Sequence, residues 1–86
     1  MKEMIQFKSM TCAPCRMMTP LLKGIEVKRD IKLTIIDVDD EDSKDLVKEH
    51  KVSVVPTLLL KVDDKIIDRF EGITMAKTIE DSFDNN

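Results

Sequence analysis

The stretch KSMTCAPCRMMTPLL, residues 8–22, holds the only two cysteines of the chain, Cys12 and Cys15, with Ala13 and Pro14 between them. A disulfide between these cysteines closes a very short loop, so it restricts the unfolded chain far less than a bridge across a long loop does. Stabilisation of the fold by a disulfide is therefore a poor explanation for the two cysteines. The spacing indicates a chemical role for the two thiols.

A strand pattern precedes the cysteines and a helix pattern follows them. Residues 3–8, EMIQFK, are apolar-rich and predict a strand that ends just before the motif. From Pro14 to about Asp30, apolar side chains recur at the spacing of one helix face. Pro14 suits the first helical turn, whereas Pro20 lies inside the helix and is expected to kink it. The apolar positions are Met18, Leu21, Leu22 and Ile25.

The middle of the chain predicts a second strand and a short helix. Residues 31–38, IKLTIIDV, are rich in β-branched side chains, which favour a strand. Residues 39–51, DDEDSKDLVKEHK, are acidic first and basic last, as the helix macrodipole prefers. Leu46 and Val47 are expected to form the apolar side of this helix.

The last third of the chain predicts a hairpin and a final helix. Residues 56–62, PTLLLKV, and residues 65–71, KIIDRFE, are expected to pair, although the turn between them lacks a glycine. After Gly72, Thr74 is expected to be the N-cap of the last helix. The side chains expected to point inward from that helix are Met75, Ala76, Ile79 and Phe83.

The resulting order, β-α-β-α-β-β-α, predicts an α/β fold in a single domain, residues 1–86. A strand, a helix and a second strand favour a right-handed crossover with parallel pairing, and the hairpin adds antiparallel strands. Reactive groups in such sheets gather at the carboxyl ends of the parallel strands. Cys12 is expected at that edge, between the first strand and the first helix.

Length and charge exclude several functional classes. A chain of 86 residues lies near the lower end of sizes that fold without staples or metals. The net charge is −3 and the basic residues are scattered, which argues against a nucleic-acid partner. Residues 1–10, MKEMIQFKSM, contain no apolar run long enough for a signal peptide or a membrane span. We therefore expect a cytoplasmic protein with no membrane partner, whose thiols are normally reduced.

The position of the cysteines favours nucleophilic thiol chemistry. At the first turn of a helix, the first thiol lies near free backbone N–H groups and the positive end of the helix dipole, so its thiolate is stabilised. The second thiol is one turn further on and can attack a mixed disulfide formed at the first. The alternative is half of a zinc site, but a closed site needs four ligands, and the chain offers two thiols and the distant His50.

Several features together resemble thioredoxin. They are the CAPC pair after a strand, Arg16 directly after it, Pro20, the segment VSVVPTLLL with Pro56, and the glycine in RFEGIT. The resemblance covers nearly the whole chain from Glu3, without the strand and helix that precede the core in full-length thioredoxins. It implies a minimal thioredoxin fold of glutaredoxin size, with a mixed four-stranded sheet and helices on both faces.

The resemblance also implies an activity and its residues. The expected function is reduction of protein disulfides, with Cys12 as nucleophile, Cys15 as resolving thiol and no cofactor besides the redox-active disulfide. Pro56 is expected to be cis, and Val55 to offer its backbone to an extended substrate segment. The expected partners of the monomer are disulfide-containing proteins and an electron donor similar to thioredoxin reductase. The remaining residues expected at the substrate site are Thr11, Ala13, Pro14 and Gly72.

Three positions depart from the family pattern. Thr11 replaces the usual tryptophan before the first cysteine, and Gln6 replaces the buried aspartate six residues before it. Glutaredoxins carry a glycine pair followed by an acid, whereas here a single Gly72 precedes Ile73, which favours a dithiol partner over glutathione. Two alternatives stay open: a glutathione-coupled, glutaredoxin-like protein, and a protein-binding module switched by redox state.

Overall fold

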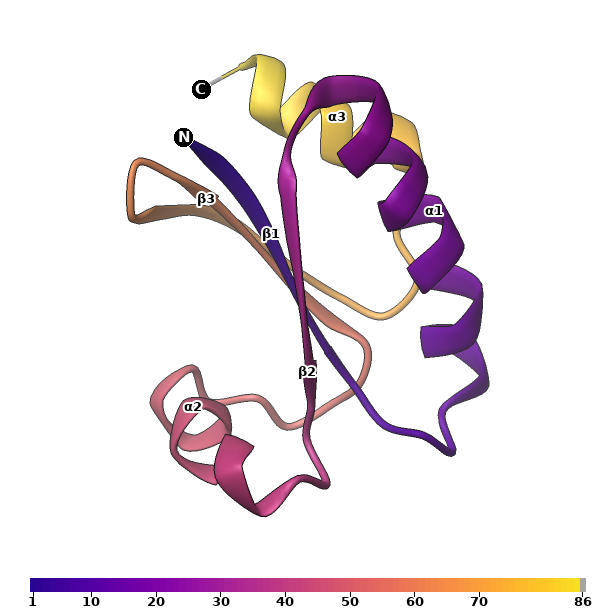
Figure 1. The fold of residues 1–86 in the computed structure, drawn as a ribbon, viewed down its shortest axis with the longest axis vertical. Coiled ribbons are helices and arrows are strands. Elements are labelled where there is room, and N and C mark those ends of the chain that lie inside the picture. Colours follow the sequence, from indigo (N-terminus) through magenta and orange to yellow (C-terminus); the bar gives the residue numbers. More distant parts are fainter. Residues whose placement is uncertain (86) are drawn as a thin grey trace.

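A computed structural model describes residues 1–85 as a four-stranded sheet with three α-helices and one 3-10 turn (Figure 1). In chain order the elements are β1 (Lys2–Lys8), α1 (Ala13–Arg29), β2 (Lys32–Asp37), the 3-10 turn (Glu41–Ser43), α2 (Lys44–Glu49), β3 (Thr57–Val62), β4 (Lys65–Glu71) and α3 (Ala76–Asp84). The predicted order β-α-β-α-β-β-α is therefore confirmed.

The sheet has the strand order β2-β1-β3-β4 and is mixed, as predicted. β1 pairs with β2 in parallel, whereas β3 is antiparallel to both β1 and β4. The register places Lys8, at the end of β1, opposite Asp37, at the end of β2. The carboxyl ends of the two parallel strands therefore meet at one edge, and the loop with the cysteines leaves the sheet there.

Helices cover both faces of the sheet, because the central strands β1 and β3 are apolar on both sides. α1 and α3 lie together against one face and α2 lies against the other (Figure 1). On the α1–α3 face the buried cluster comprises Met4, Met18, Leu22, Ile25, Ile31, Leu58, Leu60, Ile79 and Phe83. On the α2 face it comprises Ile5, Phe7 and Leu59, covered by Ile36, Val38, Val47 and Val52.

The helices differ in detail from the sequence expectation. α1 continues past Pro20 as one helix, and the kink expected there stays a prediction. The acidic front of residues 39–51 forms the 3-10 turn, so α2 itself is short. Val47 packs on the sheet, but Leu46 is 40% exposed, so its assignment to the apolar side is wrong. None of the helices within residues 1–85 combines the length and apolar composition needed to cross a membrane.

The hairpin between β3 and β4 forms as predicted, with Asp63 and Asp64 as its two turn residues. Their φ angles are 51° and 70°, so both adopt the left-handed conformation that a two-residue hairpin turn needs. Aspartate tolerates this conformation better than most side chains, so the turn forms without a glycine.

The start of α3 corrects two predictions. Met75, not Thr74, occupies the N-cap position, and Met75 is 72% exposed. Thr74 instead belongs to the preceding loop, where its N–H group contacts the Met18 sulfur at 3.4 Å and its hydroxyl donates to the Gly72 carbonyl at 3.3 Å. Thr74 as N-cap and Met75 as a core residue are therefore both wrong. The other three side chains predicted to point inward do pack against the core: Ala76, Ile79 and Phe83.

Candidate active site

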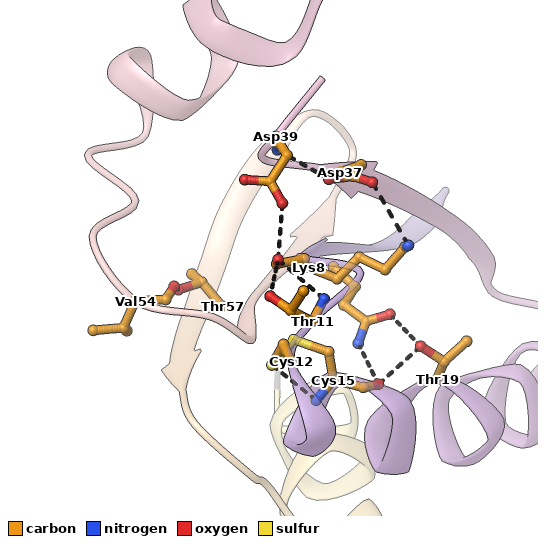
Figure 2. Close-up of a disulfide and its surroundings, with 11 residues drawn as sticks. Lys8, Thr11, Cys12, Cys15, Thr19, Asp37, Asp39, Val54 and Thr57 are labelled. Atoms are coloured by element: carbon orange, nitrogen blue, oxygen red, sulfur yellow. Dashed lines mark hydrogen bonds and ion pairs between the residues drawn. A yellow bond between two sulfur atoms is a disulfide. The ribbon is translucent and has the colours of Figure 1, made fainter. Parts of the chain in front are cut away.

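Cys12 and Cys15 form a disulfide at the start of α1 (Figure 2). Cys12 is the N-cap residue, with extended backbone, and Cys15 lies in the first helical turn, 5.2 Å away between Cα atoms. Cys12 is half-buried, whereas Cys15 is 1% exposed. An external group can therefore reach the sulfur of Cys12 more easily than that of Cys15.

The helix start stabilises negative charge on Cys12. The backbone N–H of Cys15 donates to the Cys12 sulfur at 3.1 Å, in the position where an N-cap side chain usually accepts. With a thiolate on Cys12 after reduction, this hydrogen bond becomes charge-assisted and therefore stronger, and the positive end of the helix dipole acts in the same direction. When the disulfide is reduced, this arrangement favours a thiolate on Cys12 over one on Cys15.

Gln6 lies beneath the disulfide and is fully buried. Its amide nitrogen donates to the Cys15 carbonyl at 3.4 Å, and its amide oxygen accepts from the Thr19 hydroxyl at 3.0 Å. The Thr19 hydroxyl also lies 3.0 Å from the Cys15 carbonyl, so its single proton has two acceptors. The amide of Gln6 therefore faces α1, because both of its partners lie on that helix.

Thr19 was not predicted as a site residue, although the sequence contains a signal for it. It follows Cys15 by four residues, which places the two residues on the same helix face. A buried amide such as that of Gln6 also requires hydrogen-bond partners, and a hydroxyl on the covering helix supplies one. The helix period together with the strand register could therefore have identified it.

The loop before Cys12 is attached to the end of β2 (Figure 2). The Ser9 hydroxyl donates to the Asp39 carboxylate at 2.8 Å, and the Ser9 carbonyl accepts from the Cys12 N–H at 3.2 Å. Nearby, the Lys8 ammonium lies 4.0 Å from the Asp37 carboxylate. Part of the acidic segment after β2 is thus engaged in holding the loop that carries the disulfide.

The segment with Val55 and Pro56 lies near this loop, because Val55 and Ser9 line the same hollow. The Val55–Pro56 bond is cis, as the family resemblance implied. The Gly72 N–H donates to the Pro56 carbonyl at 2.8 Å, so two of the predicted substrate-site positions meet. Gly72 has a φ of 89°, which favours glycine at that position. Within residues 1–85, the backbone N–H and C=O groups of Val55 make no hydrogen bond.

Two hollows flank the motif. One of about 400 Å³ is lined by Cys15 together with Met10, Arg16 and other residues. The second, of about 370 Å³, is lined by Ser9, Asp39, Val54 and Val55, among others, so it connects the motif loop with the Val55 segment. The remaining residues predicted at the substrate site are exposed around the disulfide: Thr11, Ala13 and Pro14.

The surroundings of the cysteines bear on the zinc alternative. Within residues 1–85, no group of three or more histidine, cysteine, aspartate and glutamate side chains is arranged to hold a metal ion. His50 is the histidine considered as a zinc ligand beside the two thiols. It is the C-cap residue of α2, and its ring packs against Phe7, with 5.9 Å between the ring centroids.

Comparison with known proteins agrees with this geometry. The sequence pattern of the thioredoxin family matches residues 2–85. The chain belongs to the thioredoxin family. Mitochondrial thioredoxin of Bos taurus is 34% identical over 76 residues, which cover 88% of this chain and 46% of that protein. This thioredoxin-family chain spans about half the length of the first curated relatives that it matches.

Solved thioredoxin structures share the fold. Oxidised mitochondrial thioredoxin 3 from Saccharomyces cerevisiae matches with a TM-score of 0.80 and 32% identity, covering 99% of this chain and 78% of that one. A mutant thioredoxin from Halobacterium salinarum matches with a TM-score of 0.88 and 25% identity, covering 98% of this chain and 73% of that one. The predicted thioredoxin fold is therefore confirmed.

Proposed function

We propose that this thioredoxin-family chain reduces disulfides in proteins by dithiol exchange, with Cys12 as the attacking thiol and Cys15 as the resolving thiol. The observation that carries the proposal is the disulfide at the start of α1, with Cys12 more accessible and Cys15 buried. The direct hydrogen bond from the Cys15 N–H to the Cys12 sulfur supports the assignment of roles.

The proposed reaction has two exchange steps. The Cys12 thiolate attacks one sulfur of the substrate disulfide, a mixed disulfide forms, and the other substrate sulfur leaves as a thiolate. Cys15 then loses its proton and attacks the Cys12 sulfur, which releases the second substrate thiolate and forms the Cys12–Cys15 disulfide. The substrate gains two electrons, and the protein loses the same two. A dithiol donor, in the manner of a thioredoxin reductase, then returns the pair to the reduced form.

The proposed substrate-binding surface comprises the exposed motif residues and the Val55 segment. An extended substrate segment would pair with the free backbone groups of Val55, which is recognition by strand addition. Thr11, Ala13 and Pro14 surround the accessible sulfur and would contact the substrate next to its disulfide. Gly72 would act indirectly, through its hydrogen bond to the Pro56 carbonyl.

The compartment does not follow from the family. The matched relatives include mitochondrial and chloroplastic thioredoxins. We keep the cytoplasm as the proposed location, because a protein that must be reduced before each turnover suits a reducing compartment.

Turnover of a protein disulfide tests the proposal. The protein should accelerate reduction of insulin by dithiothreitol, and Cys12→Ser should abolish the acceleration. Cys15→Ser is the matched variant, since it keeps the attacking thiol and should accumulate a mixed disulfide that is visible by mass spectrometry. Insulin reduction by Cys12→Ser at the parent rate would exclude Cys12 as nucleophile.

The same assay separates the two alternatives. Faster reduction with glutathione and glutathione reductase than with dithiothreitol would indicate a glutaredoxin-like protein. Tight binding of a protein partner in only one redox state, without turnover, would indicate a redox-switched binding module.

A further inference from the structure

Arg69 on β4 contacts the loop that leads to Val55 and Pro56, although neither cysteine is among its hydrogen-bond partners. One terminal guanidinium nitrogen donates to the His50 carbonyl at 2.5 Å, and the other donates to the Lys51 carbonyl at 3.1 Å. The side chain thus spans from the edge strand of the sheet to the end of α2.

Glu71 fixes the orientation of this guanidinium group. Its carboxylate accepts from Arg69 Nε at 3.2 Å and from Arg69 Nη2 at 3.1 Å. Arg69 and Glu71 are two residues apart on β4, so their side chains lie on the same face of the strand. Arg69 pairs in register with Leu59, whose side chain belongs to the cluster beneath α2, so that face is the α2 face.

The end of α2 needs such a partner. The carbonyls of residues 46–48 accept from backbone N–H groups, whereas the His50 carbonyl, at the C-cap, has no backbone donor within residues 1–85. A cation at this end also favours the helix dipole. Lys51 has a φ of 53°, which is uncommon for a side chain of its size, so the chain turns sharply as it leaves the helix. Arg69 donates to the carbonyls of His50 and Lys51, which flank the Cα atom of Lys51, where this turn is made.

β4 therefore holds the loop of residues 50–56 at both ends. Arg69 holds the beginning through the His50 and Lys51 carbonyls, and Gly72, just after β4, holds the Pro56 carbonyl at the end. Between these two anchors lies Val55, whose backbone groups have no partner within residues 1–85.

We propose that Arg69 is a positioning residue for protein substrates, because it keeps residues 50–56 in the conformation that presents the backbone of Val55. The inference rests on the proposed function, in which a substrate strand pairs with Val55. Arg69 acts through the loop and has no hydrogen bond to the cysteines, so it affects substrates that extend along the loop. A small disulfide that reacts only at Cys12 does not use this loop and is reduced independently of Arg69.

Two substrates of different size separate an effect on the Val55 loop from an effect on the reactivity of Cys12. The prereduced protein is mixed with insulin, which can lie along the loop, and separately with the small neutral 2,2′-dipyridyl disulfide. The readout is the ratio of the two second-order rate constants, which does not depend on the fraction of protein that is folded and active. Arg69→Met removes the donors and keeps much of the length of the side chain, whereas Arg69→Lys keeps the charge without the planar fork.

The matched control is Arg29→Met. Arg29 also makes charge-assisted hydrogen bonds, to Glu80 at 2.7 Å and to Asp84 at 2.6 Å, but these join α1 to α3. Its loss removes a comparable set of contacts and leaves the Val55 loop untouched.

Arg69→Met should lower the ratio of insulin rate to dipyridyl disulfide rate by about tenfold, which corresponds to about 1.4 kcal/mol of selective recognition. Arg69→Lys should recover part of the loss, and Arg29→Met should leave the ratio at the parent value. If Arg69→Met fails to fold, the lower ratio of Arg69→Lys carries the test alone.

An unchanged ratio in the Arg69 variants would overturn the inference, even if both rates fell, because equal losses indicate an effect on the thiols or on the fold. The inference would also be overturned if Arg29→Met lowered the ratio as much as Arg69→Met does, because the loss would then not depend on the Val55 loop. A parent protein that reduces dipyridyl disulfide but not insulin would instead overturn the proposed function, and the inference with it.

Discussion

Replacing Gln6 by aspartate tests how the resolving thiol is deprotonated. Thioredoxins carry a buried acid at this position, which is held to accept the proton of the resolving cysteine. Gln6 occupies that position, buried below Cys15, but an amide cannot accept a proton. We therefore expect Cys15 to be activated through water or by Cys12 as leaving group, and resolution in the parent to be slow and to quicken as the pH rises. Gln6→Asp should supply the missing base.

Gln6→Asn is the matched control, because asparagine has nearly the shape of aspartate without its charge. Both variants lose one methylene group and weaken the hydrogen bonds to Thr19 and the Cys15 carbonyl, which should cost about 1–2 kcal/mol of unfolding free energy. A buried carboxyl has its pKa raised, and a rise of about two units adds about 2.7 kcal/mol when the group is ionised. At pH 8, Gln6→Asp should thus be less stable than Gln6→Asn by about that amount.

The sign of the pH dependence follows from linkage. The pKa of the introduced carboxyl is raised in the folded state above its unfolded value of about 3.9. Below about pH 3.9 both states bind the proton, so the two variants should be equally stable. As the pH rises through that value the unfolded state ionises first, and the penalty grows until the folded-state pKa is passed. Urea unfolding at several pH values measures the difference.

Stopped-flow mixing with 5,5′-dithiobis(2-nitrobenzoate) measures the rate of resolution. Attack by Cys12 releases the first chromophore, and attack by Cys15 on the mixed disulfide releases the second. At pH 7 the second phase should be about tenfold faster in Gln6→Asp than in Gln6→Asn. This is less than the 10²–10⁴-fold typical of a well-placed general base, because the side chain contacts the Cys15 carbonyl and not its sulfur.

Equal second phases in the two variants from about pH 6 to 9, the span around the ordinary thiol titration, would refute this reasoning. A carboxylate at residue 6 would then not reach the proton of Cys15, and another group would have to accept it. A faster first phase in Gln6→Asp would also contradict it, because the effect would then act on Cys12.

Two further predictions concern the loop before the motif and the contacts between α1 and α3. Asp39→Ala removes the carboxylate that accepts a hydrogen bond from the Ser9 hydroxyl, and such a bond is worth about 1 kcal/mol. The backbone amide of Cys12 should therefore exchange with deuterium about fivefold faster. Unchanged exchange would show that the loop does not depend on Asp39. Hydrogen bonds from Arg29 lower the pKa of Glu80 and Asp84. The stability that these ion pairs contribute is therefore present above about pH 5 and is lost as the pH falls through the pKa values of the two carboxyl groups in the folded protein. Arg29→Met should therefore lose less stability on acidification in urea unfolding than the parent does, and parallel acid profiles would contradict this.

Those parts of the site that depend only on residues close together in the sequence could be predicted. A strand period of two places Gln6 on the same face as Met4, and the contacts of Gln6 with α1 confirm that register. The sequence also placed Cys12 at the start of a helix and Cys15 one turn further on, and in the structure Cys12 is the N-cap and Cys15 is buried. These predictions needed only the two-residue period of a strand and the position where the first helix begins.

Other features depend on contacts between distant segments, and the sequence does not specify these locally. Thr74 is a good N-cap residue by type, but the sulfur of Met18 and the carbonyl of Gly72 hold it in the preceding loop, and the helix begins later. Once the helix starts at Ala76, Met75 lies at the solvent-exposed N-cap. A tertiary contact thus outweighed a local preference of about 1 kcal/mol.

Arg69 is the clearest case, because nothing in the segment KIIDRFE indicates a partner 18 and 19 residues earlier. Its contacts exist only because β4 lies beside β3 and α2 lies on the face where Arg69 projects. The sulfur proposed to attack is thus placed by the start of α1, whereas the loop proposed to receive a protein substrate is held by residues on and just after β4. We therefore expect substitutions on β4 to change which disulfides are reduced without changing the reactivity of Cys12. The ratio of rates on a large and a small disulfide, rather than either rate alone, is the measurement that separates these two parts of the site.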